Sequence, residues 1–359
     1  MSLPILSAAA PDAPDAPQVV KGQRYTNALR ELRLTNTIYQ ACHFDHVTWT
    51  ECELSQLHFV DCRFEGNRFE RCTLTRLSYE ECELLDVAWI DCAQRSISHS
   101  GGTITDALWR GEHLRDSVFA HTRGARWHFD ALRSAHVSLV AAAFENIAIS
   151  GGHWSDSSWI HAEITGLQAH SARLDNFIVG RSTCRHMALV DCHGINTRWI
   201  ETNLEALTLH DCVLTQAAWS HCKWARGAFE SCRLPIASFD HASLINVDIR
   251  NSELPQALFD SARIADCDWR GMHAPRASFR LAQLRQVQLT DARLPQLDAR
   301  GAVLDSVSLA HCDCRKANLA GQARESWRHA DTQQARFDVP ADEDDRAWRQ
   351  RIHPGARQS

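Results

Sequence analysis

Apolar residues recur at every fifth position along most of the chain. From Leu29 to Leu319, 54 of the 59 positions in this series are apolar, whereas hydrophobic residues make up 44% of the whole sequence. The exceptions are Gln94, His99, Gly124, Ser134 and Gly194. A helix repeats every 3.6 residues and a strand every two, so neither keeps one face in phase at a period of five. The pattern predicts a backbone that turns regularly.

A second inward position lies two residues before each of these large apolar sites, and it usually carries a small side chain. Examples are Cys42, Cys52, Cys62, Cys72, Ala162, Ala172, Ala242, Ala262, Ala282 and Ala292. The resulting motif, small-x-large-x-x, resembles the unit of the pentapeptide-repeat proteins. Ala262-Arg263-Ile264, Ala292-Arg293-Leu294 and Ala317-Asn318-Leu319 are good matches. The chain departs from the usual form by its many Cys at the small site and Phe or Trp at the large site.

This resemblance implies an all-β fold, a right-handed quadrilateral β-helix with four pentapeptides per coil. The predicted solenoid has 14 to 15 coils, spans residues 25–321 and is about 70 Å long at the spacing of paired strands. The sequence supports the 20-residue coil independently, because its mid-chain prolines are Pro235, Pro255, Pro275 and Pro295. A proline is tolerated where no ladder N–H is needed, so this spacing places all four at one corner.

The 14 Cys and 12 Trp stand out in an otherwise ordinary composition. Every Cys falls on one of the two inward positions, and no Cys-x-x-Cys spacing typical of zinc sites occurs. Without an export signal, the thiols are expected to be reduced. We therefore interpret Cys and Trp as complementary packing, with a small thiol beside a large ring, and we expect no metal and no cofactor.

The remaining sequence features limit the domain organisation and the cellular location of the protein. The net charge of −6 argues against a general nucleic-acid binder. No long apolar run predicts a membrane span, so we expect a cytoplasmic protein, with export by a signal-less route left open. Residues 1–24 are expected to be disordered, and 322–359 to form a cap or tail with a short helix at 340–351. Residues 92–136 are expected to hold a bulge or a bend.

Two sets of outward residues are candidate binding surfaces. Aliphatic side chains predict a protein interface at Val118, Val140, Ile160, Ile178 and Ile200. Basic side chains recur every 20 residues as a stripe at His113, Arg133, His153, Arg173, His193, Arg233 and Arg293. The alternatives are isolated surface aliphatics and a solvated face neutralised by nearby acids. His221 and His241 share a column but lack a third metal ligand.

No catalytic motif occurs in the sequence, so we expect no catalytic residues and no enzyme activity. The leading hypothesis is a protein-binding scaffold, since a rigid repeat rod suits extended docking. The Cys- and Trp-rich form is similar to members associated with type VI secretion, which implies partners among secretion-apparatus or effector proteins. Alternatives are a DNA-mimic regulator of gyrase and a secreted effector. A homodimer through a terminal cap is also expected; nucleic acid and membranes are not.

Overall fold

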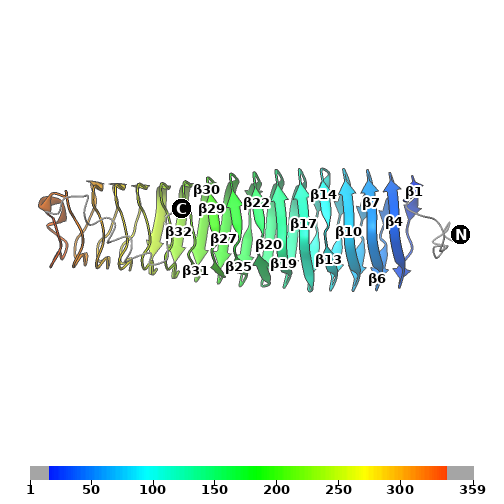
Figure 1. The fold of residues 1–359 in the computed structure, drawn as a ribbon, viewed down its shortest axis with the longest axis horizontal. Helices are drawn as coiled ribbons and strands as arrows, with labels where there is room; N and C mark the ends of the chain where they lie inside the picture. The colour runs from blue at the N-terminus through cyan, green and yellow to red at the C-terminus, as the bar shows by residue number, and fades with distance from the viewer. Residues whose placement is uncertain (1–15, 338–359) are drawn as a thin grey trace.

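The computed structural model describes residues 16–337, which form one straight rod of stacked coils (Figure 1). It is an all-β parallel solenoid of about 14 coils, as predicted. Residue pairs such as Thr73 and Ala93 lie side by side on parallel strands, which fixes the coil at 20 residues. Within the described part of the chain, no helix is long and apolar enough to cross a membrane.

The strands differ in length according to whether the chain stays extended around a corner. The strands of eight residues are β4 (Arg33–Gln40), β7 (Glu53–Val60), β10 (Thr73–Glu80), β17 (His113–Ala120), β18 (Arg123–Asp130), β19 (Arg133–Val140), β20 (Ala143–Ser150), β27 (Thr183–Val190), β30 (Asn203–His210), β32 (Lys223–Glu230) and β33 (Ser243–Arg250). The first coil contributes β1 (Gln18–Lys21), β2 (Arg24–Tyr25) and β3 (Leu29–Arg30).

The remaining strands are three residues long and occupy single sides of the coil. They are β5 (His43–Asp45), β6 (Thr48–Thr50), β8 (Arg63–Glu65), β9 (Arg68–Glu70), β11 (Glu83–Leu85), β12 (Ala88–Ile90), β13 (Ala93–Arg95), β14 (Ser98–Ser100), β15 (Thr103–Thr105), β16 (Leu108–Arg110), β21 (His153–Ser155), β22 (Ser158–Ile160), β23 (Glu163–Thr165), β24 (Gln168–His170), β25 (Arg173–Asp175), β26 (Ile178–Gly180), β28 (His193–Ile195), β29 (Arg198–Ile200), β31 (Val213–Thr215), β34 (Arg263–Ala265), β35 (Gln283–Arg285) and β36 (Val303–Asp305).

Each coil has four sides of five residues, which we name from the coil at 117–136. Side A is 117–121, side B is 122–126, side C is 127–131 and side D is 132–136, and residues 20 apart share a column. On each side the first and third residues point inward and are buried, as the small-x-large motif predicts. The fifth residue forms the corner and has a positive φ, for example 51° at Asp116 and 54° at His121.

Stacked rings fill much of the interior. On side A the rings of Tyr39, Phe59, Tyr79, His99 and Phe119 lie in one file, with successive centroids 5.2, 5.0, 4.4 and 4.8 Å apart. Such pairs each contribute about 0.5–1.5 kcal/mol beyond the area they bury. Burial lowers the pKa of His99 to about 3, so this ring is neutral inside the file.

The Cys side chains do more than fill space. All 14 are free and buried, which confirms their predicted inward positions. In addition, the Cys62 thiol donates to the carbonyl of Tyr39 at 3.3 Å, and its sulfur accepts the N–H of Cys42 at 3.4 Å. These two backbone groups flank one corner of the preceding coil. Cys62, in the next coil, therefore satisfies both backbone groups at that corner. Packing alone does not explain why this residue is Cys.

Corners near the C-terminal end are closed by the backbone itself. The N–H of Ala277 donates to the carbonyl of Ala274 at 3.3 Å, across a corner residue, Arg276, with a φ of 60°. Pro275 is then the second residue of a type II β-turn, a position that proline favours. The column of Pro235, Pro255, Pro275 and Pro295 thus lies at one corner, as the 20-residue spacing predicted.

The irregular region at 92–136 is local. The rod stays straight through these coils (Figure 1), so the irregularity is not a bend. Glu112 occupies a normally inward site but is exposed, next to Gly111 with a φ of 90°. Further along, Trp127 fills the room that Gly124 leaves, since a Cβ on Gly124 would lie 2.7 Å from the Trp127 ring.

Both ends depart from the 20-residue coil. Strand β1 pairs Val20 with Tyr39, an offset of 19 residues, so the first coil is one residue shorter and the five-residue count misses it. The solenoid therefore starts near residue 18, which corrects the predicted boundary at residue 25. At the other end Asp313 bridges to Asp331, an offset of 18.

The C-terminal end of the interior is closed by a tryptophan. The final coil contains a 3₁₀ turn, η1 (Arg324–Trp327), and Trp327 is buried against the last core residues. The helix predicted at 340–351 lies outside the described residues.

Candidate functional site

The cavity inside the described coils, near the C-terminal end, is too small for a ligand. It measures about 10 Å³, is lined only by apolar residues such as Leu304 and Trp327, and is no larger than one water would fill. Across residues 16–337 no group of three His, Cys, Asp or Glu side chains could hold a metal ion. Binding therefore depends on the outward residues of the four sides.

The five candidate interface residues lie together on side A. Val118 and Ile178 belong to one outward column, and Val140, Ile160 and Ile200 belong to the other. The two columns are separated only by the inward large residue between them. The sequence prediction that these residues form one surface is consistent with this placement.

This surface, which we call the uncharged face, extends beyond the aliphatic residues. Between 98 and 200 the two columns also carry Ser98, Ser100, Ala120, Ser138, Ser158 and Gly180, and Arg198 is the exception. Val118 is 39% exposed, whereas Ile160 and Ile178 are half-buried by their stacked neighbours. Gly180 lies beneath Ile160, whose Cδ1 would be 3.1 Å from an added Cβ, so the face stays level there.

Charged side chains border the uncharged face at its two corners. Asp116, His136 and Asp156 follow one corner, and His161 and Arg181 follow the other. His136 Nδ1 lies 3.2 Å from Asp116, so some of this border is internally paired. The arrangement is a largely uncharged centre with a charged rim, and depletion of charge at the centre is usual in a protein interface.

The predicted basic stripe also forms one column, on side D. His113, Arg133, His153, Arg173 and His193 are direct neighbours across successive coils. The positions at Arg233 and Arg293 continue this column. The sequence therefore predicted the alignment of the stripe correctly.

Acids within side D offset part of the positive charge of the stripe. The carboxylate of Asp175 accepts hydrogen bonds from Arg173 at 2.6 Å and from His153 at 3.0 Å. Burial disfavours ionisation of Asp175, but these two donors outweigh it and lower its pKa. Arg233 lies 3.8 Å from Glu253. The stripe is thus partly neutralised, which is the alternative that the sequence left open.

The two histidines considered for metal binding are stacked on a corner between sides A and B. The rings of His221 and His241 have centroids 4.9 Å apart, and His241 Nδ1 lies 3.0 Å from Asp240. Stacked rings present faces, not ring nitrogens, to one another. The geometry therefore favours ring contact over metal coordination.

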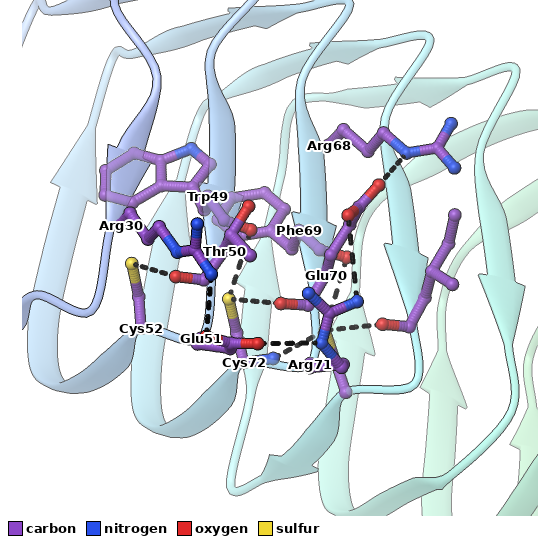
Figure 2. A network of polar contacts seen from close by, with 12 residues as sticks. Arg30, Trp49, Thr50, Glu51, Cys52, Arg68, Phe69, Glu70, Arg71 and Cys72 are labelled. Carbon is purple, nitrogen blue, oxygen red and sulfur yellow. Dashed lines mark hydrogen bonds and ion pairs between the residues drawn. The ribbon is translucent and has the colours of Figure 1, made fainter.

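Elsewhere the outer surface is covered by ion pairs that run from coil to coil. Figure 2 shows Glu51 between Arg30 and Arg71, at 3.7 and 3.1 Å, while Trp49 and Phe69 stack on the inside at 5.4 Å. Exposed pairs of this kind contribute little stability, about 0–1 kcal/mol each. The outward columns of side C between 148 and 210 also lack Asp, Glu, Lys and Arg, so the uncharged face is distinguished by its aliphatic residues.

Sequence reasoning missed one set of outward residues, the Asp-x-Arg pairs. Asp298 and Arg300 form such a pair on side A, with Arg300 Nη2 2.7 Å from Asp298 Oδ2. Both are buried, although they stand on outward columns. The recurrence of Asp-x-Arg in the sequence could have indicated the pairing, but no sequence signal marks the burial.

Comparison with known proteins gives one family match. Residues 32–109 match the family described as Pentapeptide repeat region. No curated protein matches the chain.

Several solved structures are similar at low identity. Full-length QnrB1, a plasmid-mediated fluoroquinolone resistance protein, is 15% identical, with a TM-score of 0.30, over 58% of this chain and 99% of its own. HetL, a pentapeptide repeat protein involved in heterocyst differentiation regulation from Nostoc sp. strain PCC 7120, is 16% identical, with a TM-score of 0.29, over 79% of this chain and 90% of its own.

The family match and the geometry agree on the repeat unit. The matched segment lies within the small-x-large pattern, and the same register of inward residues continues to Leu319. The chain therefore contains a pentapeptide repeat region at residues 32–109, as the resemblance of its five-residue motif indicated.

Proposed function

We propose that the protein is a non-enzymatic scaffold that binds another protein through the uncharged face of side A. The observation that supports this most directly is the run of two adjacent columns, from residue 98 to 200, with Arg198 as the only charge. Chance exposure of single aliphatics is normal on any surface. Aliphatics gathered over neighbouring coils are typical of an interaction site.

The shape of the rod favours such a role. The uncharged face spans about five coil spacings, or about 24 Å at 4.8 Å per coil. Each strand is hydrogen-bonded to a neighbour on both sides, so the backbone of the face is already ordered in the free protein. Binding therefore costs little conformational entropy. A partner with a level strip of small and aliphatic residues would fit this face.

The proposal can be tested by placing two carboxylates on the face. Val140 and Ile160 are neighbours in one column, and Val140→Asp with Ile160→Asp adds two charges that an apolar partner would have to desolvate. We expect a protein captured from the native host by the unsubstituted chain to be lost, with at least a tenfold weaker affinity.

A matched control places the same charges on side C of the same coils. Ala148 and Gln168 are also column neighbours, so Ala148→Asp with Gln168→Asp should leave capture unchanged. Far-UV circular dichroism and the unfolding midpoint establish that both variants are folded. Capture that survives Val140→Asp with Ile160→Asp would contradict the proposed face.

A finer proposal concerns the class of partner. The resemblance of the Cys- and Trp-rich repeat to members associated with type VI secretion supports a role as an accessory of that apparatus, with its components or effectors as partners. Co-purification of such a component with the unsubstituted chain, but not with the side A variant, is the expected result.

The gyrase alternative fits the charges less well. A DNA mimic needs long acidic columns, whereas the column of the basic stripe on side D carries mainly Arg and His, with Glu253 as its acid between 113 and 293. A supercoiling assay with the purified chain separates the two functions. Inhibition or protection of gyrase at low protein concentration would favour the alternative.

A further inference from the structure

Four Asp-x-Arg pairs with nearly the same geometry differ sharply in their exposure to solvent. Their closest N to O distances are between 2.7 and 2.9 Å, and both residues of each pair stand on outward columns. The pairs are Asp248 with Arg250, Asp268 with Arg270, Asp298 with Arg300, and Asp313 with Arg315. The arginine side chains are 57%, 64%, 7% and 56% exposed, respectively. Only the pair on side A is removed from solvent.

The stacking of coils does not explain this burial. Val118 belongs to the same column as Asp298 and is also stacked between two coils, yet it is 39% exposed while Asp298 is 0% exposed. Ser278, one coil before Asp298 in this column, is also 0% exposed and donates a hydrogen bond to Asp260. Burial raises the pKa of Asp260. A covered patch therefore extends over side A from Asp260 to Arg300.

The described chain ends beside this patch. Leu319 donates its N–H to the carbonyl of Arg336 at 2.7 Å, and Gly321 donates to the carbonyl of Phe337. Arg336 thus continues the column of Asp298 and Asn318 on side A, in the last coil. Twenty-two residues follow Phe337, and an extended chain of that length reaches about 70 Å. The patch lies only about three coil spacings, or about 15 Å, away.

The charges of the two parts are complementary. On side A the covered patch and the last coil carry Arg280, Arg300 and Arg336 against two acids, Asp260 and Asp298, of which Asp298 is paired with Arg300. The sequence after Phe337 contains the acidic run Asp342, Glu343, Asp344 and Asp345, followed by Trp348. Carboxylates and guanidinium groups pair strongly where water is excluded.

We propose that side A between residues 260 and 300 is the docking surface for residues 338–359 of the same chain. The acidic run pairs with the arginines of the patch, and the segment lies over Ser278 and the Asp298–Arg300 pair. Side A then carries two surfaces in the same two columns: an open one at 98–200 and one occupied by the chain itself. The inference does not depend on the partner proposed for the open surface.

Arginine modification tests the cover in the full, unsubstituted chain. Phenylglyoxal should modify Arg300 at least tenfold more slowly than Arg270 and Arg315, as measured by peptide mass spectrometry. These two arginines are matched controls because their ion pairs have the same geometry. Equal rates at Arg300 and Arg270 would overturn the proposal.

The identity of the cover is tested by reversing its charge. In the full chain with Asp342→Lys, Glu343→Lys, Asp344→Lys and Asp345→Lys, Arg300 should react at least fivefold faster, while Arg270 and Arg315 stay unchanged. Asp191→Lys with Asp211→Lys, at exposed corners, is the control and should leave Arg300 protected. Unchanged protection of Arg300 in the fourfold variant would overturn the proposal, as would protection that disappears on dilution, which would indicate a second copy.

A second reporter avoids any dependence on arginine chemistry. Because the native thiols are buried, a maleimide should label Ser98→Cys rapidly and Ser278→Cys at least tenfold more slowly, although both stand in one column of side A. Reversing the acidic run should speed labelling only at residue 278. Equal labelling of the two single variants would contradict the proposed cover.

Discussion

The coils at 42–212 and those at 254–322 solve the same backbone problem in different ways. At every corner the carbonyl of a large inward residue and the N–H of the next small residue must find partners. At many corners of the earlier coils a side chain from the next coil supplies them, as Ser182 does for Trp159 and Ala162. In the later coils the two groups bond to each other, as in Ala262 and Phe259 at 3.1 Å.

This difference teaches why the small site changes identity along the rod. Where the next coil closes the corner, the small site needs a donor and acceptor in one short side chain, and Cys, Ser or Thr provides it. Where the turn closes the corner, Ala is sufficient, and it occupies 257, 262, 277, 282, 292, 302 and 317. In the later coils some corners between sides B and C lack a turn hydrogen bond, since strand β33 stays extended there. At that corner the sulfur of Cys267, in the next coil, accepts the N–H of Val247.

The strongest test of the earlier coils is the loss of Trp127. Trp127→Ala should lower the free energy of unfolding by about 3–5 kcal/mol, because it opens a cavity and removes the donor to the carbonyl of Ile104. Urea unfolding measures the change. Trp127→Phe retains much of the volume and should cost about 1–3 kcal/mol. A loss below 1 kcal/mol for Trp127→Ala would show that neighbouring side chains refill this corner.

Acid should weaken the earlier coils through His99. Its pKa is about 3 in the fold, below its ordinary value of 6.5, so its contribution is complete above pH 6.5 and is lost as pH falls towards 3. One proton changes the unfolding free energy by about 1.4 kcal/mol per pH unit. His99→Phe should therefore reduce the loss of stability between pH 7 and pH 4.5 by about 3 kcal/mol, measured by urea unfolding. Parallel pH profiles for the two proteins would contradict the buried neutral ring.

Removing one thiol in each region compares how much the two kinds of corner depend on a Cys side chain for stability. Cys62→Ala leaves the Tyr39 carbonyl and the Cys42 N–H without their side-chain partner and should cost about 1–3 kcal/mol. Cys312→Ala is the matched control, because the corner it faces is already closed by Ala292 and Leu289 at 3.0 Å. We expect a smaller cost there in urea unfolding. Equal costs would show that the thiols act through volume alone.

The smallest effect is expected for the proline column. Pro275→Ala keeps the turn between Ala274 and Ala277 and mainly increases the freedom of the unfolded chain, so the unfolding free energy should fall by less than about 1 kcal/mol. The thermal unfolding midpoint measures the change. A loss above 2 kcal/mol would mean that these corners depend on proline itself and not on the turn hydrogen bond.

The sequence predicts the solenoid because its two inward positions repeat without interruption. The same regularity predicts which outward residues share a column, so the five aliphatic residues of the uncharged face and the residues of the basic stripe can be placed from the sequence. The corner chemistry was not predicted, because a Cys at a small site is explained by its volume alone unless the carbonyl beside it in the preceding coil, such as that of Tyr39, is known. The first coil was missed since its 19-residue offset shifts Val20 and Tyr25 out of phase.

The placement of the thiols has a further use that concerns how the rod comes apart. Each thiol is sealed while its own coil is closed, and the 14 Cys are spread from residue 42 to residue 314. Alkylation followed by mass spectrometry would therefore rank the local opening of successive coils along the molecule. Unravelling from either end, or a break in the middle, would each leave a different order of labelled peptides.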